Sequence, residues 1–310
     1  IRPETIQENI DKAKSKGVEV IILLSHNGFD VDQKLATMLN NVDVILTGHT
    51  HDAIPRAIKI KNTLLLSSGS HGKYLGRIDL KVDNGKVIDS SSNLIPIFSD
   101  IIQPDPEMNR LIDKIREPYE EECNRVVGEA ETLLYRRGNF GGPWDSVICD
   151  AIIQKRDTQI SLSPGFRWGT TLLPGQKITI DDIYSQTSMN YPEVYRTEMS
   201  GETIKNLLED VCDNIFNPDP FFQQGGDMVR IGGMSYTCHP KNKMGNRISD
   251  LSLLSSGEKI EAQKKYTIGG WGSINPDVKG PSIYNVLEDY ILDKQNISPM
   301  QNNPVTIKGM

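Results

Sequence analysis

Two short apolar runs near the start of the chain most restrict how it can fold. Residues 18–25 and 42–47 are each of strand length and mostly apolar. Between them, Leu35, Met38 and Leu39 recur at helical spacing. Continuous apolar runs of this length are typical of strands covered on both faces, as in parallel sheets. The segment therefore predicts a strand, helix, strand unit, and with it an α/β fold.

Three of the five histidines in the chain follow these two runs. His26 comes after the first run, and His49 and His51 come after the second. Because the carboxyl ends of neighbouring parallel strands meet at one edge of a sheet, we expect the three imidazoles to converge there. A single histidine is more often a surface or core residue than a ligand, but this grouping favours a metal site. Asn27 and Asp52 lie next to these positions and are expected to orient the ligands.

After residue 57 the pattern changes to one that forms hairpins. Turn signals at Lys61-Asn62 and Asn84-Gly85 predict two antiparallel strand pairs. A highly charged stretch then predicts a connecting helix over 106–127. We expect this helix to be disturbed near Pro118, because proline lacks the backbone N–H that a helix interior uses.

The remainder of the chain predicts a second, mixed domain. Helices are expected at 145–156, 200–216 and 282–292, and strands at 158–162, 194–199, 228–237, 248–254 and 265–270. The expected organisation is a partial first domain (1–103), a linker helix (104–128) and a second domain (129–310).

Charge and composition argue against two classes of partner. The net charge is −7, and no run of Lys or Arg forms the basic patch that nucleic-acid binding requires. No apolar stretch approaches the length of a membrane span. The four cysteines lie far apart without a CxxC pair, so they predict neither a zinc knuckle nor an obvious disulfide framework.

The histidine segment, SHNG…VDVILTGHTHD, resembles the second half of a calcineurin-like metallophosphoesterase domain in the 5′-nucleotidase branch. The resemblance implies an α/β (α+β) chain: the C-terminal half of an αββα sandwich, a linker helix, and a 5′-nucleotidase C-terminal-type α/β domain. It also implies two divalent metal ions, Mn²⁺ or alternatively Zn²⁺. His26 and His49 would then bind one ion and His51 the other, so that all three act in catalysis through the metals.

Four longer motifs resemble the SoxB family of thiosulfohydrolases within that branch. They are RRGNFGGPWDSVICDAI, SPGFRWGTTLLPGQKIT, QQGGDMVRIGGMSYT and YTIGGWGSIN. This resemblance implies a periplasmic hydrolase that releases sulfate from a cysteine S-thiosulfonate on the sulfur carrier SoxYZ. The partner segment would be the C-terminal arm of SoxY. Neither nucleic acid nor a membrane is expected as a partner.

Residues of these motifs suit an anionic sulfonate. The candidate substrate-binding residues are Asn139, Arg167, Gly225, Gly226, Asp227 and Arg230. Arginines can present two-pronged donors to oxyanions, and paired glycines let a ligand approach the backbone closely. Glycine pairs more often mark turns, however, and arginines more often lie on solvated faces. The family resemblance therefore supports these assignments more than the residue types do.

The chain departs from true nucleotidases where those enzymes clamp the base. Their motif resembles N-x-F-x-x-x-G-G-D-G-Y, whereas this chain has GGWGSINPDVKG there and MNYPEVY at the other ring position. The thiosulfohydrolase interpretation is therefore preferred. Two alternatives stay open: a 5′-nucleotidase or other phosphoesterase, and a non-catalytic carrier-binding module.

Other metal-ligand motifs of the branch, of the form D-x-H, G-D and G-N-H-[DE], do not precede the histidine segment. The sequence also begins without an initiator methionine or a signal peptide. We therefore expect the chain to be the C-terminal part of a longer, exported precursor, and expect it to be inactive alone.

Overall fold

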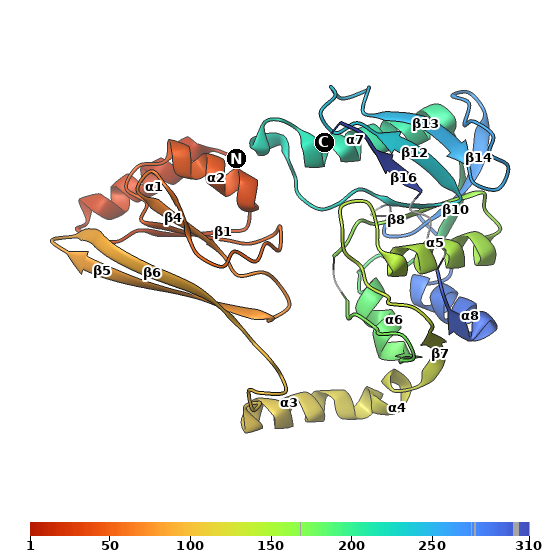
Figure 1. The fold of residues 1–310 in the computed structure, drawn as a ribbon, viewed down its shortest axis with the longest axis horizontal. Coiled ribbons are helices and arrows are strands. Elements are labelled where there is room, and N and C mark those ends of the chain that lie inside the picture. The colour runs from red at the N-terminus through yellow and green to blue at the C-terminus, as the bar shows by residue number, and fades with distance from the viewer. Residues whose placement is uncertain (168, 274, 276, 300–303, 310) are drawn as a thin grey trace. The chain divides into compact units, whose positions relative to one another are not determined.

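The computed structural model describes residues 1–309 except positions 168, 274, 276 and 300–303. Trp168 of the SPGFRWG motif thus lies outside the described residues. The chain divides into two compact units (Figure 1). Unit 1 comprises Ile1–Arg110 and Asn217–Gly225, and unit 2 comprises Leu111–Phe216 and Gly226–Met310. A short stretch of the expected second domain therefore belongs to unit 1.

Unit 1 begins with the expected alternation of helix and strand. Its first elements are α1 (Pro3–Ser15), β1 (Ile22–Ser25), α2 (Phe29–Met38), β2 (Val44–Thr47), β3 (Ile58–Ile60) and β4 (Thr63–Ser67). The strands form one sheet in the order β1-β2-β4-β3, in which β1, β2 and β4 are parallel and β3 is antiparallel. The predicted strand, helix, strand unit is thus confirmed, as is the turn at Lys61-Asn62 between β3 and β4.

The two faces of this sheet differ in burial. Leu35 of α2 packs with Ile45 and Leu65 of the sheet in the core of unit 1. On β1, in contrast, Leu24 is 82% exposed and Ile22 is 54% exposed. The expectation that the first strand is covered on both faces is therefore wrong for this chain. An apolar run predicts a strand, but it does not predict which elements are present to cover it.

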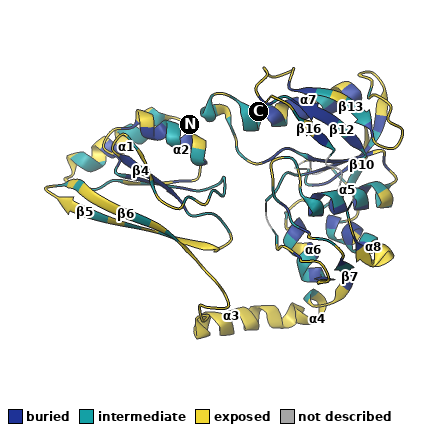
Figure 2. Ribbon diagram, viewed as in Figure 1, coloured by how far each residue is buried: buried dark blue, intermediate teal, exposed yellow. Residues whose placement is uncertain are grey.

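A long hairpin completes the first stretch of unit 1. β5 (Tyr74–Asp83) and β6 (Lys86–Pro96) are antiparallel and are joined at Asn84-Gly85. These two turn residues have φ angles of 47° and 71°, as a type I′ turn requires. The predicted turn is confirmed, and much of the hairpin is exposed (Figure 2).

The connecting segment is helical but interrupted. α3 (Pro106–Arg116) is followed by the 3₁₀ turn η1 (Glu117–Tyr119) and by α4 (Glu120–Cys123). The interruption falls at Pro118, where a disturbance was expected. Every residue of α3 is exposed (Figure 2). The next strand, β7 (Val126–Ala130), begins inside the range expected for the linker.

After the connecting segment, the described residues of unit 2 form three small sheets and the helices α5 to α8. Besides β7, its elements are α5 (Pro143–Arg156), β8 (Ile160–Ser163), β9 (Lys177–Thr179), α6 (Ile180–Thr187), β10 (Tyr195–Ser200), α7 (Gly201–Phe216), β11 (Arg230–Gly232), β12 (Met234–Cys238), β13 (Ile248–Leu253), β14 (Lys265–Gly270), α8 (Ile283–Lys294), β15 (Asn296–Ile297) and β16 (Val305–Ile307). The sheet orders are β10-β14-β8-β11, β13-β12-β16 and β15-β7-β9. The three helices predicted for this region, α5, α7 and α8, are confirmed.

The strand predicted at 228–237 is in fact two strands of different sheets. Gly233 separates β11 from β12 and has a φ angle of 73°. A Cβ at this position would lie 2.1 Å from the Gln159 carbonyl oxygen, so only glycine fits. The break was missed because the residues on both sides of it are apolar and give one continuous strand signal.

Two hydrophobic clusters fill unit 2. One includes Trp144 and residues of α5, α6 and α8, and the other includes residues of α7 and of the β13-β12-β16 sheet. Cys212 and Cys238 lie in the second cluster with their Sγ atoms 3.7 Å apart, and all four cysteines are free thiols. None of the described helices is long and apolar enough to cross a membrane.

Candidate active site

The first two strand-end histidines lie together in unit 1. His26 follows β1, His49 follows β2 by one residue, and their ring centroids are 5.2 Å apart. Gly48 makes this approach possible, because a Cβ there would lie 3.0 Å from His26 Nδ1. The parallel pairing of β1 with β2 thus brings two imidazoles together at the carboxyl edge of the sheet.

The stretch Asn217–Gly225 of unit 1 closes on His49. The Gln224 carbonyl oxygen lies 2.9 Å from His49 Nε2, and a Cβ on Gly225 would lie 2.4 Å from the same nitrogen. Gly225 has a φ angle of 75°, a conformation that glycine adopts readily. The stretch is anchored on α2, where Lys34 pairs with Asp219 at 2.5 Å. The predicted site residue Gly225 therefore lies beside a predicted ligand.

His51 lies beside a histidine to which the sequence assigned no role. Its ring centroid is 5.7 Å from that of His71. His71 follows β4, and β4 is parallel to β2, so the loop after it emerges at the same edge of the sheet. This parallel pairing was the missing signal, because the sequence predicted hairpins rather than a third parallel strand in this region. Both histidines have left-handed backbones, with φ angles of 61° and 59°.

The two expected orienting residues hydrogen-bond within the loops that carry the imidazoles. Asn27 Nδ2 donates to Ser25 Oγ at 2.9 Å, and Ser25 Oγ donates to Asp32 Oδ1 at 2.7 Å. Asp32 is fully buried, and burial raises the pKa of its carboxyl group above the ordinary value. Asp52 accepts from Thr50 Oγ1 through its side chain and from Gly69 N–H, at 2.8 Å, through its backbone. Asp32 is a buried carboxylate at this edge that the sequence did not single out.

These residues fit a metal centre only in part. In the portion of the chain that the structure describes, no group of three or more His, Cys, Asp or Glu side chains could hold a metal ion. The His26 and His49 pair supplies two imidazole nitrogens, which suit Mn²⁺ or Zn²⁺ but fall short of the three protein ligands that a catalytic zinc ion uses. His51 supplies one more imidazole.

The remaining predicted site residues lie in unit 2, and most of them touch one another. Arg167 Nε lies 2.8 Å from Asp227 Oδ1, and Arg167 Nη2 donates to the Gly226 carbonyl oxygen at 2.9 Å. Arg230 Nη2 donates to Asp227 Oδ2 at 2.7 Å. Asn139 is exposed, and its carbonyl oxygen accepts from the Met228 N–H at 2.9 Å.

Burial separates the two arginines. The Arg230 side chain is 1% exposed and also lies 3.3 Å from Asp145 Oδ2, whereas the Arg167 side chain is 23% exposed. Burial raises the pKa of Asp227, although both arginines act in the opposite direction. Arg230 is therefore placed as a buried ion-pair partner, and Arg167 is the more exposed of the two arginines.

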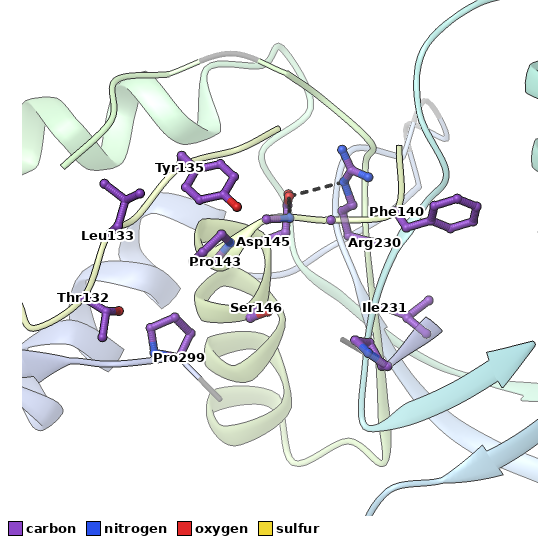
Figure 3. A pocket seen from close by; sticks show the side chains of 13 residues that line it. Thr132, Leu133, Tyr135, Phe140, Pro143, Asp145, Ser146, Arg230, Ile231 and Pro299 are labelled. Atoms are coloured by element: carbon purple, nitrogen blue, oxygen red, sulfur yellow. Dashed lines mark hydrogen bonds and ion pairs between the residues drawn. The ribbon is translucent and has the colours of Figure 1, made fainter. Parts of the chain in front are cut away.

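A pocket of about 370 Å³ opens beside this group (Figure 3). Asp145 and Arg230 meet at its wall, and Tyr135, Phe140 and Ile231 contribute further lining. The sequence did not mark this pocket, because its lining comes from separate segments that the fold brings together.

Comparisons with known proteins agree with the motifs. A family model described as "5′-nucleotidase, C-terminal domain" matches residues 126–272. The structure is similar to that of sulfate thiohydrolase SoxB from Thermus thermophilus, with 31% sequence identity, a TM-score of 0.95, and coverage of 100% of this chain and 58% of that chain. A 5′-nucleotidase precursor, also from Thermus thermophilus, has the same fold at 17% identity, with a TM-score of 0.85 and coverage of 100% of this chain and 68% of that chain.

The relatives found by sequence are longer than this chain. The trifunctional nucleotide phosphoesterase protein YfkN of Bacillus subtilis is 26% identical over 83% of this chain and 18% of its own length. The chain spans about half or less of the curated relatives it matches, including 48% of the human 5′-nucleotidase. Residues 126–272 thus match the 5′-nucleotidase C-terminal domain, and the chain as a whole is similar to SoxB.

Proposed function

We propose that this chain is part of a metal-dependent thiosulfohydrolase that releases sulfate from a cysteine S-thiosulfonate on the carrier SoxYZ. The observation that carries the proposal is the likeness to SoxB along the entire chain, at 31% identity and a TM-score of 0.95. The 17% identity to the nucleotidase precursor of the same organism supports only a shared fold. The absence of the base-clamping motif from the sequence favours the same choice.

The histidines of unit 1 would hold the metals. His26 and His49 would bind one divalent ion, Mn²⁺ or Zn²⁺, and His51 would bind a second, with further ligands still required. Such ions lower the pKa of a bound water and make it a nucleophile at neutral pH. The left-handed Gly225 and the Gln224 carbonyl would orient the His49 ring, since a hydrogen bond to one ring nitrogen determines which nitrogen is available as a ligand.

Arg167 would bind the sulfonate. Its guanidinium group presents several N–H donors in one plane and stays charged at any physiological pH. Charge neutralisation and positioning dominate the transfer of such groups, as they do for phosphoryl groups. The leaving group is a persulfide anion, which departs without strong proton donation from the protein. Asn139 and Gly226 would line the same anion site, and the exposed carrier arm of SoxY would supply the substrate.

The second candidate function is hydrolysis of nucleotides or other phosphate esters. It is favoured by the family-model match to residues 126–272 and by the names of the sequence relatives. A non-catalytic carrier-binding module is the third, and metal analysis separates it from the other two. All three would operate in the periplasm if the precursor is exported.

The test uses the purified full-length protein. We expect two divalent ions for each molecule, sulfate release from thiosulfonated SoxYZ, and turnover of AMP at least about a hundredfold slower. Faster turnover of AMP would favour the nucleotidase. A metal-free protein that binds SoxYZ without turnover would favour the binding module.

A further inference from the structure

Five side chains of unit 2 form one alternating chain of charges. Arg136 Nε lies 2.7 Å from Asp145 Oδ1, Asp145 Oδ2 lies 3.3 Å from Arg230 Nε, Arg230 Nη2 lies 2.7 Å from Asp227 Oδ2, and Asp227 Oδ1 lies 2.8 Å from Arg167 Nε. We call this set the charge ladder. The first four side chains are no more than 3% exposed, and Arg167, at the end, is 23% exposed.

The charge ladder runs from the buried interior of unit 2 toward solvent. Arg136 also donates to the backbone carbonyls of Gln186 and Pro164, at 2.7 and 2.9 Å. Arg230 is the first residue of β11 and pairs in register with Ser163 of β8. The sheet therefore fixes the backbone of Arg230, and two carboxylates hold its guanidinium group.

Stability alone does not explain this arrangement. Removing charges from water costs several kcal/mol for each ion, and their mutual attraction often does no more than offset that cost. Three guanidinium and two carboxylate groups also leave one positive charge in excess. Among the residues that the structure describes, the buried Nη1 of Arg230 has no hydrogen-bond partner. Such a set is better explained by the geometry that it imposes on its exposed end.

We propose that Asp227 is a positioning residue for Arg167, and that Arg230 acts behind it in the same role. The peptide segment Gly226-Asp227 contacts Arg167 twice, at Nε through the carboxylate and at Nη2 through the Gly226 carbonyl. Two contacts along one edge of a planar group determine its plane and its direction. Arg230 prevents the Asp227 carboxylate from rotating away.

This inference rests on the proposed function, in which Arg167 meets the anionic group of the substrate. It reassigns Asp227 and Arg230, which the motifs suggested as substrate contacts. Asp227 carries a negative charge, and its side chain is fully buried. A direct contact with a sulfonate would be repulsive, whereas a contact with the arginine that binds the sulfonate is attractive.

Asp227→Asn in the full-length, metal-loaded protein tests the proposal. The substitution keeps the shape and removes one negative charge. If Asp227 only weakened the local positive field, the loss of that charge would tighten anion binding and lower the KM. If Asp227 positions Arg167, the KM rises in spite of the added positive charge, by about tenfold, as losses of supporting residues typically do. The kcat should change less than the KM.

A double-mutant comparison separates positioning from a structural role. With Arg167→Ala as the background, the added Asp227→Asn should change the KM no further, because there is no guanidinium group left to orient. Asp79→Asn is the matched control, since Asp79 pairs with Arg77 in an exposed ion pair; its KM should equal that of the wild type. An unchanged or lower KM in Asp227→Asn, or an effect that persists in the Arg167→Ala background, would overturn the proposal.

Two further measurements test the proposal if Asp227→Asn does not fold or if turnover cannot be measured. If Asp227→Asn does not fold, Asp227→Glu retains the charge but displaces the carboxylate, and it should also raise the KM; an unchanged value would overturn positioning. Titration with inorganic sulfate reads the anion site without turnover. If the wild type hydrolyses neither thiosulfonated SoxYZ nor AMP, the proposed function fails. Weaker sulfate binding by Asp227→Asn would still support positioning, and equal binding would reject it.

Discussion

The strand-end histidines of unit 1 and the charge ladder of unit 2 are organised in opposite ways. The histidines are placed by the backbone: His49, His51 and His71 have left-handed φ angles, and Gly48 lets the His26 and His49 rings approach. The ladder is placed by its side chains, with Asp145 and Asp227 each contacting two arginines in the buried interior.

The two regions should therefore respond differently to substitution. A histidine placed by the backbone can be replaced with little loss of packing, because His26 is exposed and His49 and His51 are only partly buried. A buried carboxylate between two arginines cannot be removed in this way, since each guanidinium group would lose a partner that replaces water. Substitutions in unit 1 should therefore affect activity, and substitutions in the ladder should affect stability first.

The largest effect on stability is expected for Asp145→Ala. This change leaves Arg136 and Arg230 without a shared carboxylate and removes the acceptor of the Gly142 N–H at the start of α5. Breaking a buried ion pair on one side costs about 3–5 kcal/mol. Urea denaturation of the purified protein, followed by tryptophan fluorescence, measures the loss.

Asp79→Ala is the control for that prediction. Its partner Arg77 is on the exposed β5–β6 hairpin, and such surface pairs contribute little to stability because solvent screens them. If Asp145→Ala lost no more stability than Asp79→Ala, the charge ladder would not be a region whose substitution mainly lowers stability.

The next effect should appear in activity without loss of stability. His49→Ala and His51→Ala in the full-length protein should each lower kcat/KM by more than about 100-fold, because loss of a direct ligand exceeds the 10–100-fold typical of supporting residues. Their melting temperatures should match that of the wild type. His239→Ala is the histidine control, since His239 lies in unit 2 outside the proposed site, and it should retain at least half of the activity. More than a tenth of the activity in either ligand variant would contradict the metal assignment.

The sequence predicted the backbone-placed region well because its signals are local. Apolar runs followed by histidines, and Asn84-Gly85 with its type I′ geometry, can be identified within a few residues. What failed there was burial: Leu24 is exposed although its run is mostly apolar. His71 was overlooked because its position depends on β4 pairing in parallel with β2, which is a property of the sheet.

The ladder could not have been predicted from local signals. Arg136 and Asp227 are 91 positions apart in the sequence, and no periodicity connects them. The motifs did point to Arg167, Asp227 and Arg230, but they gave no reason to separate the exposed arginine from the buried one. That separation follows from tertiary burial alone.

A glycine substitution in unit 1 tests whether the backbone at Gly225 positions the His49 ring. Gly225→Ala should lower kcat/KM by about tenfold, since a Cβ would lie 2.4 Å from His49 Nε2 and displace the ring. Gly17→Ala is the matched control: its φ angle of 85° imposes similar backbone strain, but no atom lies within 4 Å of the added Cβ. Steady-state kinetics of both variants should show a loss only for Gly225→Ala. Equal losses would assign the effect to backbone strain rather than to the histidine.

The smallest effect is expected for Asp150, a carboxylate of unit 2 that lies outside the charge ladder. Burial raises the pKa of Asp150 on α5 to about 6, and Lys294 only partly offsets this. Since the folded pKa lies above the ordinary value of 3.8, the folded state binds this proton more tightly than the unfolded state does. The resulting stability is present below pH 4 and is lost as the pH rises through 6. Asp150→Asn should therefore stabilise the protein by about 1 kcal/mol at pH 8, or about 2–4 °C in melting temperature, with the gain shrinking toward pH 4.

Asp157→Asn, at a fully exposed side chain, is the control and should show no such trend in thermal melts across the same pH range. A gain for Asp150→Asn that does not change with pH would show that burial does not destabilise the Asp150 carboxylate.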